Sequence, residues 1–346
     1  MKRKRFLTIL AALLIALIAV PAVFANGASD AEAGDEKFVF KYGNQQPEGH
    51  SRTVSMLWFE KELEERSGGR IEVEVYHSGV LGTEEEMFEM TITGALQGYR
   101  GAFYDRLNEE FYIYNLPFLF RNYDEMKYFN ASDMAKDMLK NGSNSGIYMP
   151  AVGFTGLRGQ INKERIIMLP EDLKGLKLRS PGQAPILNFY RLFDANPQEM
   201  PWSDVYMAVK QGVVDGGDNS ASNVLAAKLY EVASYYTSIN YMAGADPFMV
   251  NMAWYESLPA DLQEIFNDVS VEALAYWDDM EAEAALEAID EIASQPGVTA
   301  VDMADYPENV AIWAEAAQPL WQDMVDEGYF TWDDINRAVA ILEEIR

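Results

Sequence analysis

The chain has 346 residues, no cysteine, and 55 acidic against 27 basic side chains, for a formal net charge of −28. A chain of this length can bury a large core and usually forms two domains, while so acidic a protein is a poor partner for nucleic acid or anionic membranes. Without cysteine, neither a disulfide nor a lipid-bearing cysteine is available. An anion would have to bind through locally concentrated arginines, so each arginine in a pocket motif is informative.

The first 25 residues have the anatomy of a secretory signal. A basic start from Lys2 to Arg5 precedes an apolar run from Phe6 to Val20, and Pro21 breaks this run before the small residue Ala25. The run is shorter than the roughly 20 residues of a transmembrane helix, so we expect cleavage near Ala25 and not an uncleaved anchor. Cleavage would change the formal net charge from −28 to −32, because it removes four basic and no acidic side chains. The predicted location is the periplasm.

The next stretch predicts a tether followed by an α/β unit. Residues 26–36 are small, polar and acidic without an apolar period, which is typical of a disordered segment. The folded part is expected to begin near Lys37. Alternation from Phe38 to Tyr42 predicts a strand, spacing from Ser51 to Ser67 a helix, and alternation from Arg70 to Tyr76 a second strand. This order favours a parallel sheet.

The same alternation of strands and helices continues along the chain. The further predicted elements are a helix from Thr83 to Leu96, a strand from Gly98 to Ala102, an aromatic loop from Leu116 to Phe120, a helix from Asp124, a strand from Ile147 to Phe154, and strands at Leu176 to Arg179 and Val213 to Val214. The last two suit a second sheet. We therefore expect two α/β lobes.

A long helix is predicted near the C-terminus. Residues 260–294 contain neither proline nor glycine and are rich in Ala, Glu and Leu, which favours one continuous helix. At 1.5 Å per residue it would extend about 50 Å and bridge both lobes; two packed helices are the alternative. Pro296 and Gly297 end it, and a strand is predicted from Val298 to Met303. The remainder is expected to be helical, with three packing tryptophans, Trp313, Trp321 and Trp332.

Three stretches of sequence carry a resemblance to a known family. They are VYHSGVLGTEEEM (Val75 to Met87), LPFLF (Leu116 to Phe120), and LPEDLKGLKLRSPG through VYMAVKQGVVDGGDN (Leu169 to Asn219). Together they resemble the substrate-binding proteins of tripartite ATP-independent periplasmic (TRAP) transporters, the DctP-like family. The resemblance extends from about Lys37 to Trp254, and more loosely to the end.

The resemblance implies a two-lobed periplasmic-binding-protein (Venus-flytrap) fold. Lobe I would comprise residues 37–155 and 245–285, and lobe II residues 156–244 and 286–346. Such a protein closes around a small organic acid, such as a dicarboxylate or sugar acid, and delivers it to a TRAP membrane permease driven by an ion gradient. The family implies a monomer without a cofactor. The alternative receiver, in place of the permease, is a sensor kinase.

The resemblance also assigns an anion-binding group. Arg179, in the LKGLKLRSP segment, would hold the ligand carboxylate, because a planar guanidinium forms two parallel hydrogen bonds to it. Arg158, in GFTGLRGQ, matches a second pocket arginine, and Asn219 would donate to the same carboxylate. For Arg179 the alternative is a surface salt bridge.

Three further residues match positions that line the cleft in the family. Trp202, in MPWSDVY, matches an aromatic position lining the cleft, with a core position as the alternative. Gln45 and Glu84 match polar cleft positions, with ordinary loop exposure as the alternative.

Arg100 is the last candidate for the cleft. If Ala102 faces the ligand, the period of a strand places Arg100 on the same face. A further arginine beside Arg158 and Arg179 would need a second acidic group on the ligand or a nearby acid such as Glu84 or Asp218. The alternative is that Arg100 pairs at the surface with Asp105 or Glu109.

A secreted hydrolase with paired carboxylates is the competing class of function. The two histidines, His50 and His77, lie near no G-x-S-x-G pattern, and no His, Asp or Glu cluster has metal-ligand spacing. Acidic runs such as Glu84 to Glu86 are typical of a helix start. We therefore expect a binding protein that is not an enzyme, and the sequence assigns no side chains as metal ligands.

Overall fold

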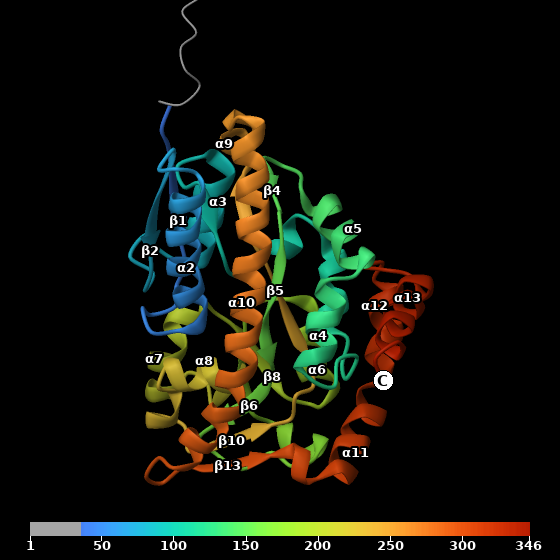
Figure 1. The fold of residues 1–346 in the computed structure, drawn as a ribbon. Coiled ribbons are helices and arrows are strands. Elements are labelled where there is room, and N and C mark those ends of the chain that lie inside the picture. The colour runs from blue at the N-terminus through green and yellow to red at the C-terminus, as the bar shows by residue number, and fades with distance from the viewer. Residues whose placement is uncertain (1–35) are drawn as a thin grey trace, which may run out of the picture. The chain divides into compact units, whose positions relative to one another are not determined.

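The structure, a computed structural model, describes residues 36–346. The predicted signal, residues 1–25, and all of the predicted tether except Glu36 lie outside the described residues. Two large β-sheets, a two-stranded sheet and the helices that cover them make up the part from Lys37 to Arg346 (Figure 1). No helix among these residues combines the length and apolar character needed to cross a membrane.

The first sheet has five strands in the order β2-β1-β3-β12-β4. Their bounds are β1 Phe38–Gly43, β2 Ile71–Tyr76, β3 Gly98–Tyr99, β4 Ile147–Tyr148 and β12 Met249–Asn251. β1 pairs in parallel with β2 and β3, whereas β12 is antiparallel to β3 and β4. On one face Phe40 packs against Phe59 of α2 (Ser51–Arg66) and against Phe266. The strand, helix and strand predicted up to Tyr76 are confirmed.

The second sheet has six strands in the order β13-β10-β6-β9-β7-β8. Their bounds are β6 Gly159–Asn162, β7 Lys177–Ser180, β8 Asn196–Glu199, β9 Gly216–Asn219, β10 Tyr235–Ser238 and β13 Thr299–Asp302. The strand predicted at Val213 to Val214 is wrong, because pairing begins only at Gly216. A Cβ atom at Gly216 would lie 2.0 Å from the carbonyl oxygen of Ile161, so the close approach to β6 admits only glycine.

Two strands connect the sheets. β5 (Val152–Leu157) and β11 (Ala243–Pro247) pair antiparallel with each other, between the segments that enter the two sheets (Figure 1). The strand predicted from Ile147 to Phe154 is thus two strands, β4 and β5, separated at Pro150, which has no N–H to donate. The predicted two-lobed α/β architecture is confirmed.

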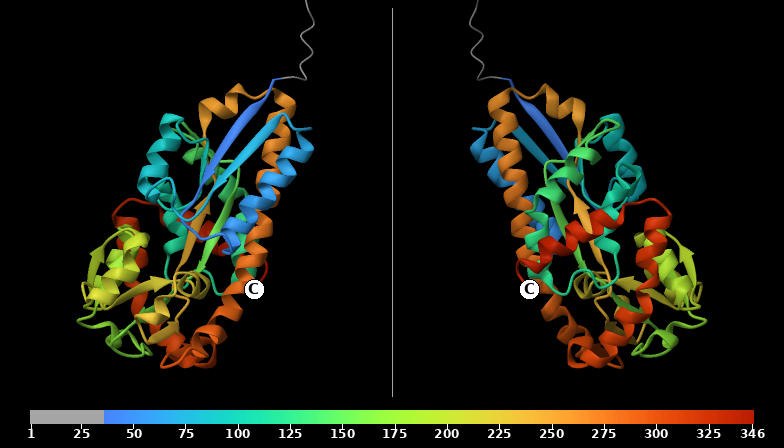
Figure 2. Two further views of the ribbon diagram at one scale, coloured as in Figure 1. Left: turned by 90° about the vertical axis from the view of Figure 1, so that its left-hand side faces the viewer. Right: turned by 90° about the vertical axis from the view of Figure 1, so that its right-hand side faces the viewer.

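A single helix, α10 (Ala260–Ala293, 34 residues), runs along both lobes. It packs against α2 of the first lobe and α8 (Ala221–Ala226) of the second, and the orange helix in Figures 1 and 2 follows this path. Trp277 near its middle is fully buried. The predicted continuous helix is confirmed, and the alternative of two packed helices is wrong.

The remaining α-helices cover the faces and edges of the sheets. They are α3 Glu84–Thr93, α4 Tyr123–Asn130, α5 Asp133–Gly142, α6 Ala184–Leu192, α7 Val205–Gln211, α9 Met252–Ser257, α11 Pro307–Ala317, α12 Pro319–Asp326 and α13 Trp332–Glu343. The α3 helix ends before the predicted Leu96 because Gly94 adopts a left-handed cap. Of the predicted packing tryptophans, Trp313 is buried, Trp321 is half-buried, and Trp332 is 40% exposed, so the prediction is wrong for Trp332.

The last helix bears on the predicted lobe boundaries. α13 packs against α4, and Arg346 pairs with Glu125 of α4 at 2.9 Å. Residues 332–346 therefore contact the first lobe, although the predicted boundaries placed all of 286–346 in lobe II. We retain the division into lobes as a proposal with this exception.

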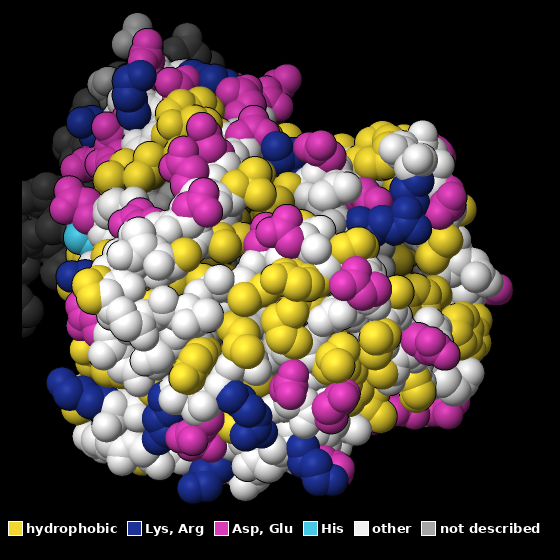
Figure 3. All heavy atoms as spheres, turned by 90° about the horizontal axis from the view of Figure 1, so that it is seen from below, with side chains coloured by type: hydrophobic (Ala, Val, Ile, Leu, Met, Phe, Trp, Pro, Cys, Tyr) yellow, Lys and Arg dark blue, Asp and Glu magenta, His cyan; other side chains and the backbone are white. Residues whose placement is uncertain are grey.

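The surface carries charge of both signs on the face seen from below (Figure 3). Acidic side chains (magenta) lie among basic (dark blue) and hydrophobic (yellow) ones on this face. Interspersed charges of this kind suit a soluble surface.

Candidate functional site

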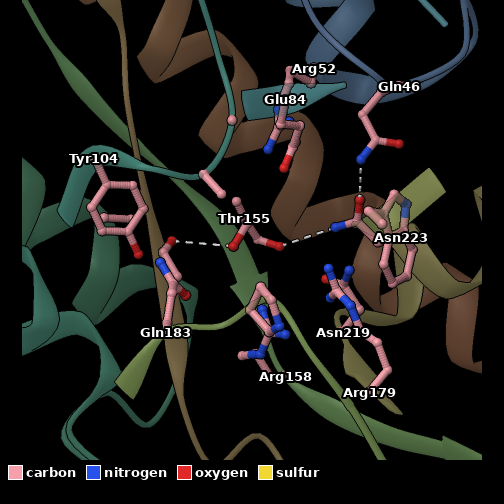
Figure 4. Close-up of a pocket in the computed structure, with 16 residues that line it drawn as sticks. Gln46, Arg52, Glu84, Tyr104, Thr155, Arg158, Arg179, Gln183, Asn219 and Asn223 are labelled. Carbon is pink, nitrogen blue, oxygen red and sulfur yellow. Dashed lines mark hydrogen bonds between the residues drawn. The ribbon is translucent and has the colours of Figure 1, made fainter. Parts of the chain in front are cut away.

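A cavity of about 70 Å³ lies between the two lobes and is here called the central cavity. Residues from both lobes line it, and most of their side chains are polar (Figure 4). They are Gln46, Arg52, Glu84, Gly101, Ala102, Tyr104, Thr155, Arg158, Arg179, Pro181, Gln183, Trp202, Asn219, Asn223, Gly244 and Ala245.

Arg179 lies near the end of β7 and is 4% exposed. Its Nε donates to the carbonyl oxygen of Met200 at 3.0 Å, and its guanidinium lies 5.3 Å from the ring centroid of Trp202. Within residues 36–346, no carboxylate oxygen lies within 4.0 Å of its guanidinium nitrogens. Burial, and secondarily the charge of Arg158, lower the pKa of Arg179 to about 10. Arg179 is therefore a charged group whose terminal N–H donors are available to an anion.

Arg158 also lines the central cavity, but its charge is balanced. Its Nε pairs with the Asp218 carboxylate, and its Nη2 donates to the Asp218 carbonyl oxygen at 3.1 Å. The Tyr241 hydroxyl donates to the same carboxylate at 2.5 Å. Burial alone would raise the pKa of Asp218, but the charge and hydrogen bond of Arg158 outweigh it and lower that pKa. Asp218 is thus one of the two nearby acids predicted to relieve repulsion among the arginines.

Glu84 lies at the first turn of α3, half-buried at the wall of the central cavity. Its neighbour in Figure 4 is Arg52 of α2. Burial raises the pKa of Glu84, whereas the positive charges of Arg52 and Arg179 oppose that rise. A carboxylate at the cavity wall can accept hydrogen bonds from a ligand's hydroxyl groups.

Asn219 and Trp202 also lie at the central cavity, on β9 and on a 3₁₀ helix (Trp202–Asp204). The Oδ1 of Asn219 accepts from the backbone N–H of Ser220 at 2.9 Å. Its Nδ2 group is therefore oriented away from this contact. The structure thus brings together five of the seven predicted site residues; their contacts with a ligand stay a prediction.

Gln45 does not line the central cavity. Its Nε2 lies 3.4 Å from the carbonyl oxygen of Gly82, and the residue lines a separate hollow beside Ser78 and Tyr206. Its neighbour Gln46 lines the central cavity instead. The prediction chose the right segment and the wrong residue, because the loop after β1 has no strand period to decide which side chain points inward.

Arg100 is buried behind the cavity wall, and both predicted placements for it are wrong. Its Nη2 pairs with Asp246 at 2.9 Å, its Nη1 donates to Ser55 at 3.0 Å, and its guanidinium lies 4.0 Å from the ring centroid of Trp277. The period-two argument failed because β3 ends at Tyr99. Beyond it, Gly101 has φ +156°, so the chain no longer alternates.

Six cavity residues with polar side chains were missed by the sequence reasoning. They are Gln46, Arg52, Tyr104, Thr155, Gln183 and Asn223. Arg52 also lies 3.0 Å from Asp246, the partner of Arg100. These residues come from separate segments, and no spacing within a segment marks them; the lone arginine near the start of the predicted helix at Ser51 was the one available signal.

Asn223 joins the two lobes across the central cavity. Its Oδ1 accepts from Gln46 Nε2 at 2.8 Å and lies 3.2 Å from His50 Nε2, while its Nδ2 donates to the carbonyl oxygen of Thr155 at 3.3 Å (Figure 4). Gln46 and His50 belong to the first lobe and Asn223 to the second. The lobes are therefore in contact over the cavity in this structure.

Residues 42–327 match the family described as bacterial extracellular solute-binding protein, family 7, or DctP. The chain belongs to this family. Its relatives include the C4-dicarboxylate-binding periplasmic protein DctP of Vibrio cholerae, which is 24% identical over 320 residues, 91% of this chain and 93% of the relative. The prediction of a DctP-like extracytoplasmic solute-binding protein is confirmed, and family membership favours it over the secreted hydrolase.

Solved structures share the fold. The sugar acid binding protein of Advenella mimigardefordensis, in complex with galactonate, is 19% identical with a TM-score of 0.82, over 90% of this chain and 99% of that one. A TRAP periplasmic solute-binding protein of Shewanella oneidensis with bound succinate is 23% identical with a TM-score of 0.82, over 88% and 99%. The predicted two-lobed fold of a periplasmic binding protein is thus confirmed.

Proposed function

We propose that this DctP-family protein captures one small organic acid in the central cavity and delivers it to a TRAP membrane permease. Arg179 anchors the ligand carboxylate, with Asn219 as a second donor and Trp202 as an apolar wall. The observation that carries this proposal is a buried, charged Arg179 at the cavity without a carboxylate partner among residues 36–346. A buried charge of this kind is costly unless an anion completes it.

The balance of charges favours a ligand with one carboxylate. Of the three arginines that line the cavity, Arg158 pairs with Asp218, and Arg52 pairs with Asp246 behind the wall. Arg179 alone of these three has no carboxylate oxygen within 4.0 Å among residues 36–346, so one positive charge remains available to a ligand. A single ligand carboxylate would neutralise it, whereas a second one would face Glu84 without a free cation.

The remaining wall suits hydroxyl groups. Gln46, Thr155, Gln183, Asn219 and Asn223 present amides and a hydroxyl to the central cavity. Together with Glu84 they offer neutral donors and acceptors, as a polyhydroxylated acid requires. We therefore favour a sugar acid over a C4-dicarboxylate, both of which occur among the ligands named for relatives.

A panel of acids tests this function. D-galactonate and D-glucuronate are compared with succinate and with acetate by thermal shift, followed by calorimetry. At a concentration a hundredfold above Kd, a ligand adds about 2.7 kcal/mol of stability, so we expect a clear rise in melting temperature with a sugar acid. A rise with succinate alone would contradict the charge balance, and no rise with any carboxylate would contradict the proposed function.

The predicted export to the periplasm is part of the proposal, since the relative in Vibrio cholerae is periplasmic by name. Cleavage near Ala25 would release residues 26–346. N-terminal sequencing of the exported protein tests this: a first residue near Asn26 is expected, and a retained Met1 would contradict cleavage.

A further inference from the structure

Glu281 of α10 lies outside the central cavity, is fully buried, and accepts hydrogen bonds from both lobes. Its Oε2 accepts from Ser51 Oγ at 2.6 Å, and its Oε1 accepts from Ser222 Oγ and, at 3.3 Å, from Ser220 Oγ. Ser51 is the first residue of α2 in the first lobe. Ser220 and Ser222 stand at the start of α8 in the second lobe. One carboxylate thus joins a helix of each lobe.

The same network reaches the wall of the central cavity. Ser220 Oγ accepts from Asn223 Nδ2 at 2.7 Å, and Asn223 Oδ1 accepts from Gln46 Nε2 at 2.8 Å. Ser220 Oγ lies 3.3 Å from Glu281 Oε1 and 2.9 Å from Ser222 Oγ, and with its one proton directed to either of them its oxygen is left to accept from Asn223. The direction of these hydrogen bonds fixes the orientation of the Asn223 side-chain amide, whose nitrogen points toward Ser220 and whose oxygen points toward Gln46.

The backbone beside Glu281 leaves no spare room. Gly156 of β5 has φ +89°, and a Cβ atom there would lie 2.7 Å from Ser220 Cβ and 3.1 Å from Glu281 Oε1. β5 is one of the two strands that connect the lobes. The carboxylate therefore lies where α2, α8, α10 and the connecting strand meet.

We propose that Glu281 is a positioning residue for ligand capture, which holds the lobes in the closed arrangement and orients Asn223 at the cavity wall through Ser220. The ligand in this inference rests on the proposed function, whereas the motion of the lobes does not depend on it. If the lobes move apart, Ser51 separates from Ser220 and Ser222, and one carboxylate can no longer bond to all three. The hydrogen bonds of Glu281 therefore stabilise the closed arrangement of the lobes and not the open one.

Several titratable groups face Glu281. They are Arg52 from α2 and Tyr123 from α4, and His50, directly before α2, lies 3.5 Å through its Nδ1 from the Ser51 hydroxyl that donates to Glu281. Among the residues of α8, none is charged. Burial raises the pKa of Glu281 to about 6, against the lowering by the serine hydroxyls and Arg52.

The sign of the pH effect follows from this pKa. Opening admits water and returns the pKa toward the ordinary 4.5, so the closed form binds the proton more strongly. Glu281 therefore favours closure more at pH 5 than at pH 7.5, by about eightfold in the ratio of closed to open protein.

The opening equilibrium is measured with spin labels. The chain has no cysteine, so a Val80→Cys, Met207→Cys pair labels two exposed sites, one on each lobe, without background. Pulsed electron paramagnetic resonance then gives the lobe-to-lobe distance, without ligand and with D-galactonate. Ser51→Ala and Ser222→Ala should each reduce the closed population severalfold. Ser270→Ala is the control, because Ser270 lies on α10 and its hydroxyl donates to its own helix at Phe266.

Glu281→Gln separates positioning from a purely structural role. Glutamine resembles the protonated carboxyl, so the variant should stay closed near neutral pH and lose the Glu281 contribution to the pH profile. The closed-to-open ratio of the parent, divided by that of the variant, should then rise about eightfold from pH 7.5 to 5, with the His50 contribution common to both.

Three results would overturn the proposal. The first is parallel pH profiles of the parent and the Glu281→Gln protein, and the second is serine variants with the same closed population as Ser270→Ala. The third is a parent protein with no detectable closed population, either without ligand or with D-galactonate. Because the ligand-free distances need no organic acid, failure of the panel to bind would refute the proposed function separately.

Discussion

Arg179 and Arg158 lie at the same cavity but differ in what their guanidinium groups contact. Arg158 is paired with Asp218, whereas Arg179 bonds to a carbonyl oxygen and lies near Trp202. An Arg179→Ala variant should bind the cognate acid at least tenfold more weakly, since removing one partner of a buried charge pair costs on the order of 2 to 5 kcal/mol. Lysine should restore only part of the affinity, because a point charge lacks the two-pronged contact.

Calorimetry on the Arg179 variants checks this expectation, with Arg191→Ala as the control. Arg191 lies in the same lobe and its Nη1 bonds to Asn188 on the exposed side of α6. Equal affinity of parent and Arg179→Ala protein would remove Arg179 as the anchor.

Arg100 should matter for stability and little for the ligand. In the Arg100→Met variant, Asp246 keeps Arg52 as its one cationic partner, and breaking a buried pair typically costs about 3 to 5 kcal/mol. Denaturant unfolding should show this loss while the affinity for the acid changes little. Arg66→Met, which breaks exposed pairs with Glu62 and Glu272, should cost less than about 1 kcal/mol. If the Arg100→Met protein lost affinity for the acid without losing stability, Arg100 would be a ligand-binding residue, contrary to this expectation.

At the scale of elements, the start of α2 is sensitive to acid. His50 caps this helix, since its Nδ1 accepts from the Arg52 N–H at 3.0 Å, and burial, with the charge of Arg52, lowers the pKa of His50 to about 3. The unfolded chain binds the proton near the ordinary value of 6.5, so the stability from His50 is complete above pH 6.5 and is lost as the pH falls toward 3. From pH 6.5 to 5 the loss is about 2 kcal/mol.

A His50→Asn variant tests the acid sensitivity, because asparagine is also a good N-cap. Its free energy of unfolding should fall less than that of the parent between pH 6.5 and 5. Glu281 acts in the opposite direction, since its raised pKa contributes stability below 4.5 that is lost as the pH rises through about 6, and this contribution is common to both proteins. Equal slopes would show that His50 does not carry the effect.

Elements with strong periodicity were predictable, and those defined by tertiary pairing were not. The strand at Phe38, the helix at Ser51 and the helix at Ala260 follow from local pattern, because each buries one regular face. The strand expected from Gly98 to Ala102 ends at Tyr99, where a positive-φ glycine intervenes. The missing strand at Val213 to Val214 depends on which glycines can approach β6, a contact that lies outside the local sequence.

The residues of the candidate site also divide into those that the sequence predicted and those that only tertiary packing brings to the cavity. Arg179, Arg158 and Asn219 were predictable because they stand in motifs of the family, and the structure places all three at the central cavity. Asn223 and Arg52 were not, since they reach the cavity only through the way α8 and α2 pack across the lobes. The burial of Arg100 depends on Asp246, 146 residues further along the chain.

At the scale of the whole molecule, two lobes, two connecting strands and one long helix form a frame that can close on a ligand. The connecting strands β5 and β11 and the helix α10 are the segments that pass between the sheets, so a hinge motion would act through them. Closure excludes water from the central cavity and strengthens the contacts of Arg179. A rigid molecule would gain neither effect.

Small-angle X-ray scattering with and without the acid that binds most tightly tests capture by closure most directly. With saturating D-galactonate, or another sugar acid from the panel, the radius of gyration should become measurably smaller than in the ligand-free protein. The same acid should leave the Arg179→Ala protein unchanged at that concentration. An identical radius of gyration with and without saturating ligand would contradict capture of an organic acid by closure of the two lobes.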